Sequence, residues 1–272
     1  MKTKLLKGLG VVLFCLQHSN PVFAQYPNVT GYQAALGQAT LTDTTAWALF
    51  HNPASYRNGN TSSYQLICSD QYRAGLSELK SKQLGVLWSK SNTMVGATFQ
   101  KFGYTYLHQT SVAIHAAHQV QVFRLSGSFY YEQWLANETY KVNTWRINFG
   151  GTWHLQPKWV AGLWISNVTW NKVKSIPQPI SLQVGVKWKV SSEVEINSEL
   201  HLTDKQPQWH NGIMYHIHPN ITLMGGWISR SQTFSTGFSI HKKLQQLGYS
   251  YSFQSLSGSV HHLFLRIGLC TK

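Results

Sequence analysis

One pattern repeats along most of this chain: about ten residues in which apolar and polar side chains alternate, closed by turn residues. In residues 181–190, every second residue from Leu182 to Val190 is apolar, and polar residues or glycine stand between them. Successive side chains of a strand point to opposite faces, so each run predicts a strand with one apolar and one polar face. Repeated from residue 62 to residue 269, the pattern predicts about 14 strands.

The connections between these predicted strands alternate between long and tight. Long connections fall at 70–81, 131–143 and 169–179, and tight ones lie near 90–92, 156–158 and 242–243. Outer-membrane barrels have short periplasmic turns and longer outer loops, whereas a β-sandwich has no reason to alternate in this way. The predicted fold is therefore all-β: a transmembrane antiparallel β-barrel over residues 62–272, in the outer membrane, with both termini periplasmic. The alternative is a periplasmic β-sandwich or a pair of β-domains.

The first 24 residues have the features of a signal peptide. Lys2, Lys4 and Lys7 form a basic start, an apolar run follows from Gly8 to Leu16, and a small-residue cleavage site ends at Ala24. This apolar run is roughly half of the ~20 residues that a spanning helix needs. No later segment offers eighteen apolar residues without charge, so a membrane location requires strands, and with them a closed barrel.

Composition agrees with export into an envelope. Charged residues make up 12% of the chain, against about 25% in soluble domains, and 11 Trp are present. The formal net charge of +14 raises the question of nucleic acid, but an exported chain without an Arg-rich helix or RNA-binding motif is a poor candidate for it. An anionic membrane surface or anionic solutes remain as explanations for the basic balance.

Residues 25–61 precede the first strand and do not alternate. Asp43 is predicted to cap a short helix over 46–50, which must end before Asn52 and Pro53. A barrel of about 14 strands has a lumen too wide for side chains alone to fill. We therefore interpret residues 25–61 as a plug for the lumen.

Within this plug, AALGQATLTDTTAWALFHNPASY (Ala34–Tyr56) resembles the N-terminal signature of the FadL and PorV-like outer-membrane barrels. The resemblance implies a 14-stranded barrel whose N-terminal segment folds inward as a hatch. Two departures stand out: the chain is shorter than familiar members, and its last strand ends at Leu269 without the typical C-terminal aromatic residue. The positions that carry the resemblance are Gly37, Asp43, Trp47, Phe50, Asn52, Pro53 and Ala54.

The polar faces of the predicted strands carry a mixed set of charges with cations in excess. We interpret these charges as a hydrogen-bonded ladder that stabilises the barrel interior, and the alternative is a solute path that prefers anions. The predicted lumen-facing charges are Arg124, Arg146, Lys187, Lys189, Glu195, Glu199 and Arg266.

Histidines are frequent, but their spacing does not predict a metal site. His216 and His218 are close in sequence, as are His261 and His262, yet no Cys or carboxylate stands beside them in a ligand-like array. Solvated or interfacial histidines are the better interpretation. We therefore predict neither a metal nor another cofactor.

An enzymatic barrel, such as a lipid A deacylase or phospholipase, needs a Ser, a His base and an orienting group near one interface. Ser and His are abundant, but no such arrangement can be distinguished, so we predict that the chain is not an enzyme. The predicted partners are outer-membrane lipid and either a small hydrophobic ligand or secretion-system proteins, and nucleic acid is not among them.

Three functional hypotheses follow from these features. The first is FadL-like passage of a small hydrophobic or amphipathic molecule with the hatch as gate, which predicts an apolar pocket and a break in the barrel wall. A polar lumen filled by the N-terminal segment counts against it. The second is a PorV-like role in type IX protein secretion, and the third is a structural envelope barrel.

Overall fold

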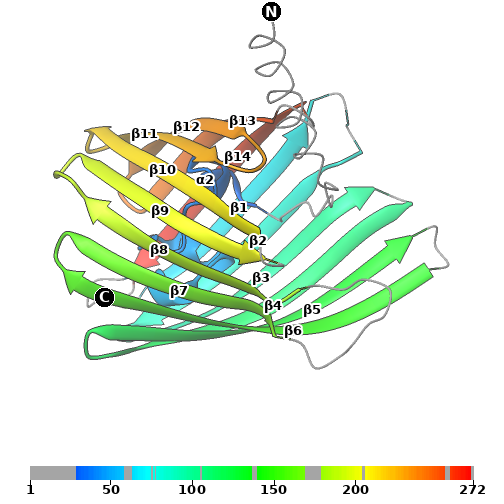
Figure 1. Cartoon of the computed structure of the whole chain (residues 1–272), viewed down its shortest axis with the longest axis horizontal. Coiled ribbons are helices and arrows are strands. Elements are labelled where there is room, and N and C mark those ends of the chain that lie inside the picture. The colour runs from blue at the N-terminus through cyan, green and yellow to red at the C-terminus, as the bar shows by residue number, and fades with distance from the viewer. Residues whose placement is uncertain are drawn as a thin grey trace, which may run out of the picture.

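The computed structural model describes residues 29–57, 63–74, 76, 78–104, 106–136, 140–168, 179–203, 206–254 and 258–270. These residues form a closed antiparallel barrel of 14 strands around an N-terminal segment with three short helices (Figure 1). The predicted fold class and strand number are confirmed. The predicted signal peptide, residues 1–24, lies outside the described residues.

The observed strands lie close to the predicted runs. The largest differences are at the predicted connections 70–81 and 131–143, into which β1, β5 and β6 extend. The strands are β1 (Ser63–Arg73), β2 (Ser81–Lys90), β3 (Thr93–Tyr104), β4 (Leu107–Val120), β5 (Phe123–Ala136), β6 (Tyr140–Gln156), β7 (Trp159–Val168), β8 (Ser181–Lys189), β9 (Val194–Thr203), β10 (Gln206–His218), β11 (Ile221–Ile228), β12 (Thr233–Lys242), β13 (Gln245–Gln254) and β14 (Gly258–Cys270).

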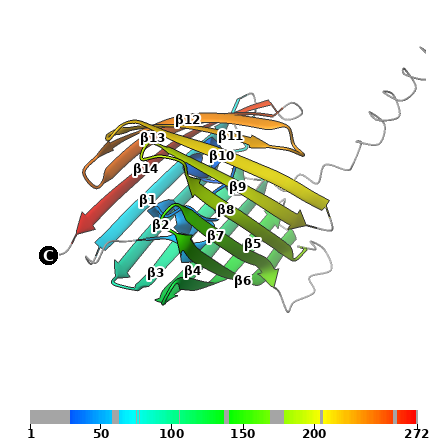
Figure 2. The same ribbon diagram turned by 60° about the vertical axis from the view of Figure 1, so that its left-hand side comes forward.

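Each strand pairs with its neighbours in sequence, and β1 closes the ring by pairing with β14, where Ser63 lies opposite Cys270 (Figure 2). The ladder is irregular between β6 and β7 and between β10 and β11. We call the end of the barrel that carries connections 91–92, 121–122, 157–158, 190–193, 219–220 and 243–244 the tight-turn end. The start of β1 and the end of β14 lie at this end.

The two faces of the wall differ in polarity. On β4, Ser111 and His115 point inward and are buried, whereas Val112 and Ile114 point outward, with Ile114 61% exposed. The same alternation gives the barrel an apolar outer surface and a polar inner one, which is the arrangement that a lipid environment requires of a barrel. Among the described residues, no helix is long and apolar enough to cross a membrane.

The N-terminal segment, Val29–Arg57, contains α2 (Gly31–Ala35) and the 3₁₀ helices η1 (Ala46–Phe50) and η2 (Pro53–Ser55). The predicted helix over 46–50 is present, but its cap is not Asp43: the side chain of Thr45 accepts the hydrogen bond from Trp47 N. Asp43 instead accepts hydrogen bonds from Thr45 itself. Helix α2 was not predicted from the sequence, although Thr30 and Gln33 form the reciprocal capping box that marks its start.

This segment lies inside the ring of strands, where Figure 1 shows it in blue. Its hydrogen bonds reach strands on opposite sides of the wall: Gly31 N donates to Ser69 of β1, and Leu41 N donates to Glu199 of β9. Apolar side chains of the segment also pack against the wall in one buried cluster that includes Leu49, Ile67 and Phe264. The segment is therefore held by both polar and apolar contacts around the lumen.

Candidate functional site

The Asn52–Pro53–Ala54 sequence forms the turn that begins η2. The Asn52 side chain accepts a hydrogen bond from Ala54 N at 3.2 Å, and its amide donates to the carbonyl of Leu41 at 3.0 Å. Pro53 stands in the first turn, where a missing N–H costs nothing. Thr152 of β6 donates to the Ala54 carbonyl at 2.7 Å. The turn thus closes the segment on itself and ties it to the wall.

Gly37 lies at a close approach of the segment to the wall. Its φ is +58°, and a Cβ at this position would lie 2.6 Å from the backbone nitrogen of Trp227. Gly37 N donates to Ser235 Oγ at 3.1 Å, and its carbonyl contacts His210 Nδ1 at 2.9 Å. A glycine is required here because both the backbone conformation and the space exclude a side chain.

Trp47 and Phe50 project from η1 into the apolar cluster. The Trp47 ring stacks on Tyr32 with centroids 5.6 Å apart, meets Phe264 edge-on at 5.4 Å, and donates from Nε1 to Gln246 at 3.0 Å. Phe50 packs over Gly85 of β2, where a Cβ would come within 2.9 Å of its ring. This side of the segment is close-packed against the wall.

Asp43 lies on another side of the segment, fully buried. Its Oδ2 accepts a 2.6 Å hydrogen bond from the Thr45 hydroxyl, and its Oδ1 lies 3.2 Å from Thr45 N and 3.3 Å from the Tyr32 hydroxyl. Burial raises the pKa of this carboxyl, and the nearby Lys187 ammonium opposes the shift. Burial also holds the pKa of Tyr32 well above its ordinary value, so its hydroxyl stays protonated and can donate.

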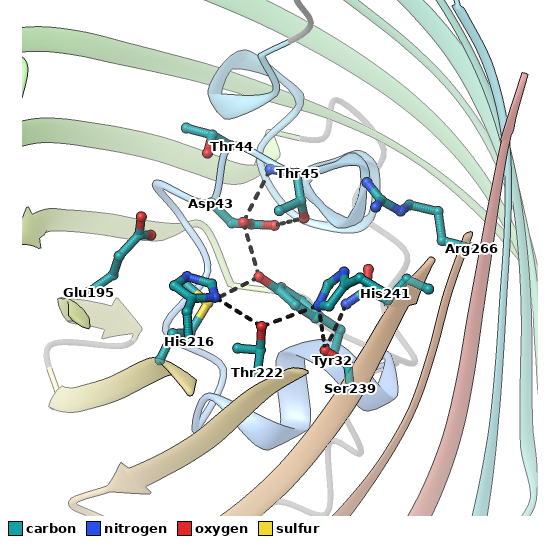
Figure 3. Close-up of a pocket in the computed structure, with 12 residues that line it drawn as sticks. Tyr32, Asp43, Thr44, Thr45, Glu195, His216, Thr222, Ser239, His241 and Arg266 are labelled. Carbon is teal, nitrogen blue, oxygen red and sulfur yellow. Dashed lines mark hydrogen bonds between the residues drawn. The ribbon is translucent and has the colours of Figure 1, made fainter. Parts of the chain in front are cut away.

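A cavity of about 140 Å³ lies beside Asp43, between the segment and strands β9–β14 at the tight-turn end (Figure 3). One water takes about 30 Å³ in the liquid, so the cavity has room for roughly five waters or one small solute. Every residue around it except Met214 carries a polar side-chain group, alongside the apolar parts of residues such as Tyr32 and the threonines. The residues around it are Tyr32, Asp43, Thr44, Thr45, Glu195, Met214, His216, Thr222, Ser239, His241, Gln246 and Arg266.

A hydrogen-bonded chain crosses the floor of this cavity. His216 Nδ1 lies 2.9 Å from the Thr222 hydroxyl, which lies 3.2 Å from His241 Nε2. His241 Nε2 is also 3.0 Å from the Ser239 hydroxyl, to which the Gln246 amide donates at 3.2 Å. Because Gln246 accepts from an indole N–H of η1, the chain connects the wall to the N-terminal segment.

A second polar contact lies on the β8–β10 side. Glu199 is fully buried and accepts from Leu41 N at 2.5 Å, while its other oxygen is 3.1 Å from His201. His51, at the end of η1, contacts Thr40 and Gln183 through its two ring nitrogens. Burial lowers the pKa of His51 below its ordinary 6.5, and the carboxylate of Glu199 opposes that shift.

The structure brings some of the predicted charges together and leaves others apart. Lys187 and Lys189 lie 3.6 and 3.9 Å from Glu195 at the edge of the cavity. Arg146 forms a 2.6 Å ion pair with Glu132 farther up the lumen, and Arg124 contacts the Tyr56 ring of the segment. Arg266 reaches into the cavity.

Several cavity residues were not predicted as site residues from the sequence, namely Tyr32, Thr44, Thr45 and the polar residues of β10–β13. The signal that could have found the wall residues is the inward phase of each strand close to a tight turn. The interpretation of the paired histidines as solvated or interfacial is wrong for His262, which is buried on the inner face. Within the described residues, no group of His, Cys, Asp and Glu has the arrangement of a metal site.

The barrel is similar to solved transporter structures. The toluene transporter TbuX of Ralstonia pickettii has a TM-score of 0.65 and 12% identity, over 90% of this chain and 98% of that chain. The CymD monoaromatic hydrocarbon channel has a TM-score of 0.64 and 13% identity, over 88% and 96%. The toluene transporter TodX of Pseudomonas putida has a TM-score of 0.59 and 12% identity, over 88% and 97%.

These likenesses cover nearly the whole of each chain, so the protein shares the fold of these three barrels, in agreement with the barrel that the resemblance of Ala34–Tyr56 implied. At such low identity the shared property is the fold. No family model matches the sequence. No curated protein matches it either.

Proposed function

We propose that this chain is an outer-membrane passage for small hydrophobic or amphipathic molecules, and that the N-terminal segment closes it in the conformation described above. The observation that carries the proposal is the placement of Val29–Arg57 inside a barrel whose fold is shared with three transporters of small aromatic molecules. The segment is hydrogen-bonded to β1 on one side of the lumen and to β9 on the other.

Two features of the structure favour an amphipathic solute over a hydrocarbon. Each strand pairs with both neighbours around the ring, so the described strands do not show the expected break in the wall. The cavity beside the segment is lined by charged and hydrogen-bonding residues such as Asp43, Gln246 and Arg266, whereas passage of a hydrocarbon predicts a pocket without them. A solute with a hydrogen-bonding group is therefore a better match to this lumen than an unsubstituted hydrocarbon.

Uptake by intact cells tests the passage. Cells that carry the chain are compared with cells that lack it, and the initial uptake of radiolabelled benzyl alcohol is measured at low concentration. We expect faster, saturable uptake in the cells that carry it. Equal rates in the two strains, with the barrel present in the outer membrane on an unboiled gel, would overturn the proposal.

Planar-bilayer conductance tests the role of the segment. The mature chain is expected to conduct poorly, and a variant without residues 25–57 is expected to form open pores, because 14 strands alone leave a wide lumen. The unboiled gel shows whether the variant still folds as a barrel. A folded variant with the same low conductance would show that the segment is not the gate. The type IX secretion role, the structural role and the absence of enzymatic activity stay predictions.

A further inference from the structure

Two opposite charges line the polar cavity without pairing. Asp43 faces it from the N-terminal segment, and Arg266 faces it from β14 (Figure 3). Among the described residues, neither side chain takes part in an ion pair, with the other or with a third group. An isolated charge in a protein interior costs several kcal/mol unless something compensates it, so each of the two is a place for a complementary group.

The surroundings of Asp43 offer it dipoles and one nearby cation, Lys187, which forms no ion pair with it. Its hydrogen bonds come from Thr45 and the Tyr32 hydroxyl, which are neutral. Burial raises the pKa of Asp43 and the Lys187 ammonium opposes the rise only in part, so a cationic ligand would favour the carboxylate form. Lys187 is a nearby cation, but it is already bound to Glu195 and to the Thr44 hydroxyl. A ligand with an ammonium group would supply the missing charge.

Arg266, in contrast, is a cation without an ion-pair partner among the described residues. Its Nε is buried and has no hydrogen-bond partner among the described residues, and Figure 3 shows its side chain reaching from the wall toward Thr45. A guanidinium presents its N–H groups in a fixed fork that matches the two oxygens of a carboxylate. The other charged or titratable groups at the cavity are Tyr32, bonded to Asp43, Glu195, bound by two lysines, and the histidines His216 and His241, joined through Thr222.

We propose that this cavity binds a small zwitterion, the carboxylate on Arg266 and the ammonium on Asp43, of the size and charge of a free amino acid. Such a ligand brings no net charge into the site and satisfies both unpaired groups at once. Since Asp43 belongs to the N-terminal segment and Arg266 to the wall, the bound ligand bridges the two. The site stands on this geometry and is independent of which solute the barrel passes.

Calorimetric titration of the detergent-solubilised mature chain with glycine tests this site. Acetate and methylammonium, which each carry one half of the zwitterion, are titrated in parallel. We expect glycine to bind about tenfold or more tightly than either half, because a charge-assisted hydrogen bond contributes about 1.5–3 kcal/mol. Absence of glycine binding, or acetate binding as tight as glycine binding, would overturn the proposal.

Two substitutions test which residue binds the carboxylate of the ligand and which binds its ammonium group. Arg266→Gln should weaken glycine about 10- to 100-fold and leave methylammonium unchanged, and Asp43→Asn should weaken glycine and leave acetate unchanged. Arg230→Gln is the matched control, because it removes the same charge at the opposite end of the barrel, in the exposed turn after β11. Unboiled gels confirm that each variant is folded. Unchanged glycine binding in folded Arg266→Gln or Asp43→Asn protein would contradict the proposed site.

Discussion

The N-terminal segment meets the barrel wall in two different ways. On its apolar side, Trp47 and Phe50 pack tightly against aromatic residues and wall glycines. On its polar side, Asp43 faces a cavity of about 140 Å³ in which two charges lack ion-pair partners among the described residues. Any movement of the segment breaks packing contacts on its apolar side, whereas the cavity on its polar side has room for water or a ligand. The apolar contacts therefore hold the segment more firmly, and the polar side is where the proposed ligand would bind.

Removing the main apolar anchor should have the largest effect. Trp47→Ala deletes a fully buried ring, a change that costs about 3–5 kcal/mol in protein cores. We expect the folded band on unboiled gels to convert at a lower temperature and the planar-bilayer conductance to rise. Trp209→Ala is the control, because that ring is 50% exposed on the outer surface and its loss should leave conductance low. Equal behaviour of the two variants would contradict the assignment of the anchor.

The close approach of segment and wall gives the next largest effect. A Cβ on Gly226 of β11 would collide with the backbone of Gly37, so Gly226→Ala should displace the segment at a cost of about 1–3 kcal/mol and raise conductance. Its neighbour Gly225 has only ordinary contact at 3.4 Å with Ile213, which makes Gly225→Ala a matched control. Low conductance in folded Gly226→Ala barrels would show that the segment can shift without opening the lumen.

The buried carboxylate of β9 tests the polar contacts with the segment. Glu199→Ala leaves Leu41 N without its acceptor, which should cost about 1–3 kcal/mol, whereas Glu199→Gln keeps an acceptor oxygen and should cost less. Urea unfolding of barrels in lipid vesicles measures both values. An equal loss in the two variants would mean that the negative charge, and not the hydrogen bond, holds the segment.

A pH dependence through His51 should be the smallest effect. Burial lowers the pKa of His51 in the docked segment, so the docked form binds fewer protons than a released one. Its contribution to docking is complete above about pH 6.5 and is lost as the pH falls through that value toward the lowered pKa. Conductance should therefore rise on acidification, and His51→Gln should reduce this response. An identical pH profile for the variant would exclude His51 as its source.

The wall could be predicted almost completely from the sequence, and the segment only in part. Alternation along each strand is a local property, so the strand number and the inward phase of Arg124 or Glu199 follow from the residues themselves. The cap of η1 was misassigned, because Asp43 and Thr45 are both good capping residues and only the fold decides between them. The start of α2 was readable from Thr30 and Gln33, and was missed.

By itself, the sequence determined that these residues form a closed barrel of strands with an apolar outer face, because the two-residue period of a strand ties each side chain to one side of the wall. Only the tertiary structure decided which inward residues share a space. Asp43 and Arg266 are far apart in the chain and meet at one cavity because ring closure brings β14 next to β1 while the segment folds back inside. Local periodicity carries no information about such contacts.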